Sequence, residues 1–362
     1  MKVPQCDLPA QHAPLREGIH AAVDRVLDSC AFNLGEEVLS FEKSFAAALN
    51  VKHAIAVSNG SSAVHLALLA SGIRPGDEVI VPALTFTATA AAVEWCGASP
   101  ICADIDDTGC LCPQAFEKAV TKKTRAVIPV HLYGQPAAMD EITAIANAHK
   151  IVVIEDTAQA HLARYHGRFC GTLGTAASFS FYPTKNLGAC GESGAVTTND
   201  DDIAQSVREL RDWGAKHQRR GFNNRMHALQ AAILSLKFKH LQQWTTLRQA
   251  AAARYEKQLA GHDGLQIPKR REETEHVFHQ FAVLVRQREK TIQKLKENNI
   301  GFGIHYPRPL HLQPCFADWG CQRGDFPTAE KFAEQEISLP IFAEIKAEQI
   351  AHVCSTLRAM RL

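Results

Sequence analysis

A chain of 362 residues suggests about two domains, at roughly 150 residues per domain. Its 39 Lys and Arg residues nearly balance 38 Asp and Glu residues, and this formal net charge of +1 argues against a dedicated nucleic-acid binder, which carries a basic excess. With 46% hydrophobic and 21% charged residues, the composition is that of a globular protein and not of a disordered one.

Signals for export and for membrane insertion are missing from the sequence. Residues 1–7 lack the apolar core of a signal peptide, and no apolar run reaches the roughly 18 residues that suggest a membrane span. The 11 Cys residues are odd in number and include no Cys-x-x-Cys pair. We therefore expect a cytoplasmic protein with reduced thiols, no membrane partner and no nucleic-acid partner.

Short β-branched runs alternate with helical patterns from about residue 50 to residue 200. A helix is predicted over residues 61–71, because two Ser residues can cap its start and Gly72 can end it. Strands that alternate with helices predict an α/β fold whose mainly parallel sheet is flanked by helices. The predicted buried strands are residues 54–57, 79–81, 101–103, 126–130 and 151–154.

Helical patterns dominate the chain after residue 200. Asp200 is a predicted N-cap, and Ile203, Val207 and Leu210 follow on one helical face. Residues 226–259 predict one long helix without Gly or Pro, of the kind that bridges two domains.

The last hundred or so residues mix short strands with helices. Strands are predicted at residues 281–285 and 303–306. This mixture predicts a smaller C-terminal α+β domain. We place the N-terminal segment and the large domain at residues 1–245, and the small domain at residues 246–362.

The sequence does not match the residue spacing of several common binding and catalytic motifs. The glycines of residues 188–194 do not match a dinucleotide loop, and no P-loop or nucleophile elbow is present. His161, His166 and Cys170 lie close in sequence, but no second paired cluster accompanies them. We therefore expect no metal site.

Three other segments suggest a single kind of chemistry. In residues 151–161 an apolar strand ends at Asp156, and open α/β sheets bind ligands beyond the carboxyl ends of their strands. Residues 178–188 place Lys185 in an aromatic and glycine-rich stretch after a strand. Residues 57–63 form a strand, a tight turn and a Ser-capped helix start, where free N–H groups and the helix dipole favour an anion.

Each of these segments also has a simpler interpretation. Asp156 could cap a helix, Lys185 could be an exposed loop residue, and the turn before Ser61 could serve only for capping. Together, however, the segments fit a pyridoxal phosphate site. There a Lys forms a Schiff base with the cofactor aldehyde, a carboxylate partners the protonated pyridine nitrogen, and a helix N-terminus holds the phosphate. The released Lys can then move the substrate α-proton as a general base.

Seven blocks that cover nearly the whole chain extend this pattern. They are residues 58–63 (SNGSSA), 82–90 (PALTFTATA), 130–135 (VHLYGQ), 155–161 (EDTAQAH), 180–188 (SFYPTKNLG), 221–226 (GFNNRM) and 303–307 (GIHYP). In this order they resemble the nucleotide-sugar aminotransferases of the DegT/StrS type, a fold type I pyridoxal phosphate family. The order of all seven is far more specific than any single block.

The resemblance implies a role for each matching residue. Lys185 would be the Schiff-base Lys, Asp156 would pair with the pyridine nitrogen, and Gln159 would lie beside the ring hydroxyl. Phe86 would stack on the cofactor ring, unless it is a core residue. The residues that would hold the phosphate are Gly60, Ser61, Ser62, Ser180 and, from the neighbouring subunit, Asn223.

The same resemblance implies a homodimer with shared active sites, because Asn223 would reach the partner's phosphate. The alternative is that Asn223 caps the following helix within its own chain. Tyr182, His305 and Tyr306 would border the sugar pocket, although residues 305–307 could also be a structural turn.

A few positions depart from the pattern of this family. Ser193 stands where a second Gly is usual, so the backbone path must differ there if that Gly serves a close approach. Leu162 stands where Gly is common, and Thr157 where Ala or Ser is common; both could reshape the pocket. None of these changes removes a chemical group that the reaction requires.

We therefore expect an aminotransferase with pyridoxal 5'-phosphate as cofactor. It would move an amino group from Glu or Gln to a keto sugar that is nucleotide-linked, and the block around Lys185 favours a 3-keto over a 4-keto sugar. A keto-cyclitol is the alternative acceptor. Lys185 argues against the deoxygenating branch of the family, which has His there. A non-catalytic regulator on the same fold is the rival from another class.

Overall fold

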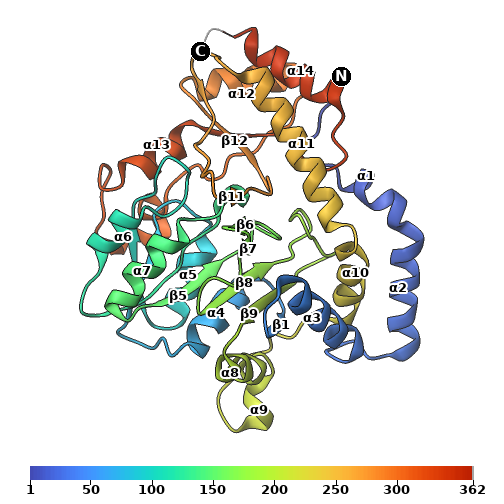
Figure 1. Cartoon of the computed structure of the whole chain (residues 1–362), viewed down its shortest axis with the longest axis vertical. Coiled ribbons are helices and arrows are strands. Elements are labelled where there is room, and N and C mark those ends of the chain that lie inside the picture. Colours follow the sequence, from blue (N-terminus) through green and yellow to red (C-terminus); the bar gives the residue numbers. More distant parts are fainter. Residues whose placement is uncertain (361–362) are drawn as a thin grey trace.

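The centre of the protein is a mainly parallel sheet, seen in a computed structural model that describes residues 1–360. Within these residues, seven strands follow the order β1-β9-β8-β5-β4-β2-β3 (Figure 1). All neighbours from β8 to β3 are parallel, whereas β9 is antiparallel to both β1 and β8. The strands are β1 (His53–Val57), β2 (Glu78–Pro82), β3 (Ser99–Ala103), β4 (Thr124–Val127), β5 (Val152–Asp156), β8 (Ala176–Ser180) and β9 (Gly194–Thr198). The α/β fold and four of the five predicted strands are confirmed, whereas the strand predicted at residues 126–130 is β4, which starts at Thr124 and already ends at Val127.

Both faces of this sheet are buried, which explains its continuous apolar strands. In β1, Ile55 and Val57 belong to one hydrophobic core, whereas Ala54 and Ala56 belong to another. Helices supply the rest of each core: α3 packs on β1, α4 on β8 and β9, α5 and α6 on β3, and α7 on β5. The bounds of these helices are α3 (Glu36–Leu49), α4 (Gly60–Ala70), α5 (Thr87–Trp95), α6 (Pro113–Ala119) and α7 (Met139–His149).

The C-terminal part of the chain builds an α+β unit around a hydrophobic core of its own. Its antiparallel sheet contains β10 (Leu265–Gln266), β12 (Phe281–Val285) and β13 (Glu336–Leu339). Helix α14 (Ala347–Arg358) packs on α11 (Leu241–Leu259) and on α12 (Arg288–Glu297), and the N-terminus lies at the same end of the molecule (Figure 1). The predicted boundary between residues 245 and 246 falls inside α11 and stays a prediction.

Two other elements differ from their predictions. The helix expected over residues 226–259 is two helices, α10 (Ala228–Phe238) and α11, because α10 packs on α2 (Arg16–Ser29) and α3 while α11 packs on α14. The strand expected over residues 303–306 is a single β-bridge between Gly303 and Ser338. It does not extend because the next N–H available for pairing, that of His305, donates to the Glu336 side chain instead.

Short elements complete the structure. As predicted, Asp200 caps α8 (Asp201–Arg211) with its side chain. The other helices and strands are α1 (Leu8–His12), α2 (Arg16–Ser29), α9 (Trp213–His217), α13 (Pro327–Gln335) and a small sheet of β11 (Thr274–Glu275), β6 (Arg164–Tyr165) and β7 (Arg168–Phe169); 3₁₀ turns lie at Ala13–Leu15, Leu132–Gly134, Leu310–Leu312 and Pro314–Trp319.

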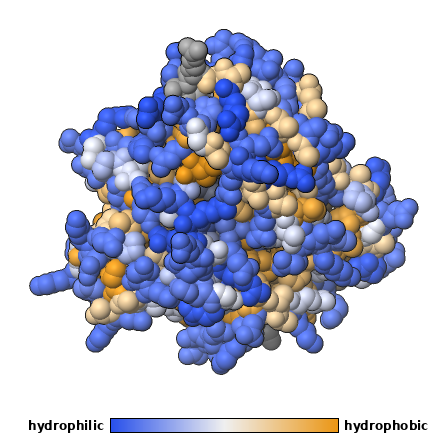
Figure 2. Space-filling model, turned by 45° about the horizontal axis from the view of Figure 1, so that its top comes forward, coloured by the Kyte–Doolittle hydropathy of each residue, from blue (hydrophilic) through white to orange (hydrophobic). Residues whose placement is uncertain are grey.

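The surface carries mixed polar and apolar side chains. Hydrophilic residues cover most of the face in Figure 2, with smaller apolar patches between them. Over residues 1–360, no helix combines the length and the apolar character that crossing a membrane requires.

Glycines let the start of α4 approach the ends of β8 and β9 closely. A Cβ on Gly194 would lie 2.4 Å from Asn59 O, and a Cβ on Gly60 would lie 2.6 Å from Ser180 Cβ. Neither position would accept a side chain without a shift of the backbone. Ser193, by contrast, has no positive φ, and its Oγ donates to Glu192 O at 2.6 Å. The close approach therefore depends on Gly194, and Ser193 is accommodated beside it.

Candidate active site

A cavity of about 480 Å³ lies where the start of α4, the ends of β5 and β8, and the loop after Gly303 come together. Ten of the predicted site residues line it: Gly60, Ser61, Phe86, Asp156, Gln159, Ser180, Tyr182, Lys185, His305 and Tyr306. The structure thus gathers residues that are up to 246 positions apart in the sequence around one space. Ser62 and Asn223 do not line it.

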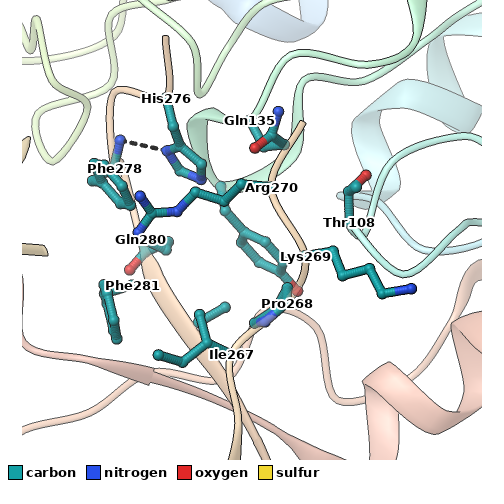
Figure 3. Close-up of a pocket in the computed structure, with 12 residues that line it drawn as sticks. Thr108, Gln135, Ile267, Pro268, Lys269, Arg270, His276, Phe278, Gln280 and Phe281 are labelled. Atoms are coloured by element: carbon teal, nitrogen blue, oxygen red, sulfur yellow. Dashed lines mark hydrogen bonds between the residues drawn. The ribbon is translucent and has the colours of Figure 1, made fainter. Parts of the chain in front are cut away.

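A second cavity near Arg270 is too small to bind a sugar (Figure 3). Its volume is about 20 Å³, which is room for about one water molecule. The Arg270 guanidinium lies over the Phe278 ring, 4.4 Å from its centroid. The cavity lined by Asp156 and Lys185 is the candidate active site, because it gathers the predicted site residues.

Asp156 is the last residue of β5, and its carboxylate is held in a fixed orientation. Its Oδ2 accepts from Thr89 Oγ1 at 2.9 Å, and its Oδ1 accepts from the N–H of Ala158 at 3.1 Å. The residue is 7% exposed. Turns follow it at residues 157–163 and no helix begins there, so the helix-cap interpretation of Asp156 is wrong.

A buried hydrogen-bond network behind Asp156 supports this end of β5. The carboxylate of Glu155 accepts from His131 Nε2 at 2.9 Å and from the N–H groups of Gly171, Leu173 and Gly174 at 2.7–2.8 Å. Cys170 lies beside it, and burial raises the pKa of its thiol well above the ordinary value. These hydrogen bonds hold the Glu155 carboxylate in place and so support the end of β5 that carries Asp156.

Lys185 lies in a turn after β8 and faces the same cavity as Asp156. Burial lowers the pKa of Lys185 to about 8, although attraction to Asp156 opposes this shift. Nearby imidazoles add no positive charge, because burial lowers the pKa of His161 to about 3 and that of His305 to about 4. The alternative of a freely exposed loop lysine is therefore wrong.

The start of α4 offers N–H groups to the cavity. Asn59 Oδ1 accepts from the N–H of Ser62 at 2.8 Å, and the N–H of Ala63 donates to Asn59 O. The N–H groups of Gly60 and Ser61 find no partner in the described part of the chain. Capping thus accounts for the hydrogen bond to the Asn59 side chain. It leaves the N–H groups of Gly60 and Ser61, together with the helix dipole, available to bind an anion.

Ser62 and Ser180 differ in their relation to this anion site. Ser62 is buried, and its Oγ accepts from Ser58 Oγ at 3.0 Å. Ser180 lines the cavity, so its hydroxyl is the one that can reach a ligand there.

The amide of Gln159 is oriented by two neighbours. Its Oε1 accepts from the N–H of Tyr133 at 2.6 Å, and its Nε2 donates to the Tyr306 hydroxyl at 3.0 Å. The Phe86 ring is 58% exposed and lies 5.8 Å from the ring of Tyr306, so Phe86 is not a core residue. Tyr182, 47% exposed, also lines the cavity.

Asn223 is exposed on the loop between α9 and α10. Its Oδ1 accepts from the Arg225 guanidinium at 2.9 Å. The N-cap of α10 is His227, which makes no side-chain capping hydrogen bond. Asn223 thus does not cap that helix, and its role toward a partner subunit stays a prediction.

The structure also adds residues that the sequence patterns did not indicate. Thr89 holds Asp156, and His279 lines the cavity and approaches Asn186 Oδ1 at 3.2 Å through its Nδ1. Thr89 lies in the block at residues 82–90 one helical turn after Thr85, so a search for polar residues at helical spacing could have found it. His279 has no local signal, since it reaches the site through tertiary contacts.

Two departures from the expected pattern lie outside the cavity. Leu162 has φ of +63°, in the left-handed region that favours Gly. Neither Leu162 nor Thr157 lines the cavity, so they do not reshape its wall directly.

Comparisons with known proteins agree with this geometry. The profile of the DegT/DnrJ/EryC1/StrS aminotransferase family matches residues 14–358. A protein of Geobacillus stearothermophilus named pleiotropic regulatory protein is 47% identical over 98% of this chain and 97% of its own length. The dTDP-3-amino-3,4,6-trideoxy-α-D-glucose transaminase of Streptomyces venezuelae is 42% identical over 99% of this chain and 96% of its own length.

A solved structure is similar in three dimensions as well. The crystal structure of S. venezuelae DesV in complex with a ketimine intermediate superposes with a TM-score of 0.97 at 42% identity. The superposition covers 99% of this chain and 98% of that chain.

The lowered pKa of Lys185 predicts its reactivity in the protein stripped of any bound cofactor. Since the neutral amine is the nucleophile, labelling of Lys185 by acetic anhydride should be half-maximal at a pH of about 8, below the roughly 10.4 of a solvent-exposed lysine. Asp156→Asn should lower this midpoint further, because attraction to Asp156 raises the pKa. Mass spectrometry of the labelled peptide measures both values. A midpoint near 10 would contradict the burial of Lys185.

Proposed function

The chain belongs to the DegT/DnrJ/EryC1/StrS aminotransferase family, and from this premise we propose that it transfers an amino group from glutamate or glutamine to the 3-keto group of a nucleotide-linked sugar. It is a sugar aminotransferase that depends on pyridoxal 5'-phosphate. The observation that carries the proposal is the position of Lys185 and Asp156 on one cavity, beside the free N–H groups of α4.

The described residues fit this cofactor in shape and in chemistry. Gly60 and Gly194 keep side chains out of the turn before α4, so a phosphate can reach the helix N–H groups and the hydroxyl of Ser180. Asp156 would hold the pyridine nitrogen and Gln159 would contact the ring hydroxyl. The exposed Phe86 ring would cover one face of the cofactor ring, and Lys185 would hold the cofactor covalently.

The bound cofactor supplies an electron sink for the carbanion and carries the amino group between the two substrates. Lys185 moves the proton on and off the substrate carbon. Its pKa of about 8 lies close to neutral pH, where a general acid–base is most effective. Hydrogen bonds from Thr89 and from the N–H of Ala158 hold the Asp156 carboxylate in place at the site.

The identity of the acceptor is the finer part of the proposal. The relative from Streptomyces venezuelae is named for a dTDP-linked 3-amino sugar, and this supports a nucleotide-linked 3-keto acceptor here. Tyr182, His305 and Tyr306 would contact the sugar at the mouth of the cavity. A keto-cyclitol is the alternative acceptor. The regulatory name of the Geobacillus relative favours a regulator as the second candidate function.

We also propose a cytoplasmic homodimer with shared active sites. Asn223 is exposed, lies outside its own cavity and does not cap α10, so its amide is available to a partner subunit. In such a dimer it would reach the phosphate site of the partner.

Absorption of the purified holoprotein tests the proposed reaction. L-Glutamate or L-glutamine should convert the near-visible cofactor band to the amine form, and dTDP-3-amino-3,4,6-trideoxy-α-D-glucose should do the same from the product side. L-Alanine and free glucosamine serve as controls and should act much more slowly. A cofactor band that none of these amines changes would favour the regulator. Conversion by an amino-cyclitol alone, among sugars and cyclitols, would favour the cyclitol acceptor.

Asp156→Asn should lower kcat by several orders of magnitude. The substitution keeps the shape but removes the charge that protonates the pyridine nitrogen, and electrostatic effects of this kind contribute about 3–4 kcal/mol or more. Glu192→Gln is the matched control, since it removes a carboxylate from the same cavity wall and should change kcat by less than about threefold. A loss below tenfold in Asp156→Asn would mean that its carboxylate only fastens the loop.

Subunit exchange tests the shared site. Lys185→Ala and Asn223→Ala are each expected to be impaired, but a mixed dimer has one doubly altered site and one intact site. Random exchange at equal concentrations makes about half of the dimers mixed, so about a quarter of the wild-type activity should return. Mixing Lys185→Ala with Asp156→Asn is the control, because both residues line one cavity and no site becomes intact. Activity that stays at the average of the two parents would place Asn223 in the site of its own chain.

A further inference from the structure

Three hydrogen bonds fix His305 through its backbone and its ring, and a fourth joins two of its partners, Ser338 and Glu336. Glu336 Oε2 accepts from the N–H of His305 at 2.6 Å, and the Tyr133 hydroxyl donates to His305 O at 2.5 Å. Ser338 Oγ lies 2.8 Å from His305 Nδ1 and 2.5 Å from Glu336 Oε1. Glu336 and Ser338 are two residues apart on β13, so their side chains project from the same face of the strand.

These contacts form a chain of exchangeable protons that leads from a buried acid to the active site. Glu336 and Ser338 are fully buried, whereas His305 lines the candidate active-site cavity. The other ring nitrogen of His305, Nε2, makes no hydrogen bond to any described residue and is therefore the ring atom left for a ligand. Burial raises the pKa of Glu336 to about 8, so its carboxyl carries a proton at neutral pH.

The protonation of Glu336 decides which nitrogen of His305 carries the ring proton. Oε2 must accept from the backbone N–H, so a neutral Glu336 carries its proton on Oε1 and donates it to Ser338. Ser338 then donates to Nδ1, and the ring proton is on Nε2, toward the cavity. When Glu336 is ionised, Ser338 donates to Oε1 instead and accepts from Nδ1–H, which leaves Nε2 bare.

We propose that Glu336, Ser338 and His305 form a proton relay that protonates the oxygen leaving the keto sugar as water; this inference rests on the proposed function. His305 Nε2 gives its proton to that oxygen, which keeps the electron pair of the breaking carbon–oxygen bond. Ser338 passes its hydroxyl proton to Nδ1 of His305. The carboxyl proton on Glu336 Oε1 then moves to the Ser338 hydroxyl. The negative charge ends on Glu336, and proton uptake at Nε2 resets the relay by the reverse path.

The relay allows His305 to act as an acid without becoming an imidazolium. Burial and the nearby charge of Lys185 lower the pKa of His305 to about 4, so a charged ring would be a minor species at neutral pH. In the relay, one proton leaves Nε2 while another arrives at Nδ1, and the ring stays neutral. Glu336 and Ser338 are therefore positioning residues, and His305 is the group that contacts the substrate.

The tautomer of His305 tests the relay without any sugar. In protein labelled with ¹⁵N-histidine, His305 is assigned by the signal that is lost in His305→Asn. The wild type should carry its ring proton on Nε2 at pH 6.5 and move it to Nδ1 as the pH rises through about 8, because Glu336 ionises there. Glu336→Gln should keep the proton on Nε2 up to pH 9.5, because the amide oxygen accepts from the N–H of His305 and the amide NH2 group, which can only donate, then faces Ser338.

Other titratable and charged groups face this network and are retained in Glu336→Gln. They are Lys185, His279, Tyr133, Tyr306 and Arg288. A tautomer switch that persists in Glu336→Gln would therefore assign the titration to one of them and overturn the relay. A wild-type ring that does not switch between pH 6.5 and 9.5 would overturn it without any variant.

The two half-reactions separate the relay from a merely structural role. In holoenzyme, Glu336→Gln and Ser338→Ala should slow the half-reaction with dTDP-3-amino-3,4,6-trideoxy-α-D-glucose by about 10- to 100-fold, because acid–base catalysis contributes on this scale. The half-reaction with L-glutamate also exchanges an oxygen with water, that of 2-oxoglutarate, but the proposal assigns His305 to the sugar oxygen alone, so this half should change by less than about twofold. Equal slowing of both halves would contradict the relay. A wild type inert toward every amine would contradict the proposed function, while the histidine signals would still decide the relay.

Discussion

Asp156 and Lys185 line the same cavity, and the attraction between them offsets part of the cost of burying the lysine. The sheet places both residues, because parallel β5 and β8 end side by side with Asp156 opposite Ser178. Hydrogen bonds from Thr89 and Ala158 hold the carboxylate, and the glycines at positions 60 and 194 bring the start of α4 close to the same edge. An acid, an amine and an anion site thus share one space.

Local sequence predicted the elements that build this space. Four of the predicted strands, the helix start after Asn59 and the Asp200 cap depend on periodicity and capping, which are short-range properties. The break between α10 and α11 follows instead from packing on different partners and has no Gly or Pro to mark it. The strand expected at residues 303–306 failed because a side chain, that of Glu336, takes the N–H that a strand would pair.

The site residues also divide into those that local sequence predicts and those that only tertiary contacts reveal. Lys185 and Asp156 follow strands and lie in recognisable blocks, so the sequence predicted them. Thr89, His279 and Glu336 act through contacts with residues far away in the chain, which no local pattern reveals. The proposed chemistry divides in the same way: Lys185 moves the proton on carbon, whereas His305 and the residues behind it move the proton on oxygen.

Reduction of the holoprotein with borohydride tests most directly whether Lys185 is the residue that holds the cofactor. Borohydride fixes the bond between the cofactor and its lysine, and mass spectrometry of the digest then locates the added mass. We predict that the cofactor mass is on the peptide that contains Lys185, and that it is lost in Lys185→Ala. Modification of a different lysine, or no modification of a protein that has bound the cofactor, would contradict the assignment of this cavity as the active site.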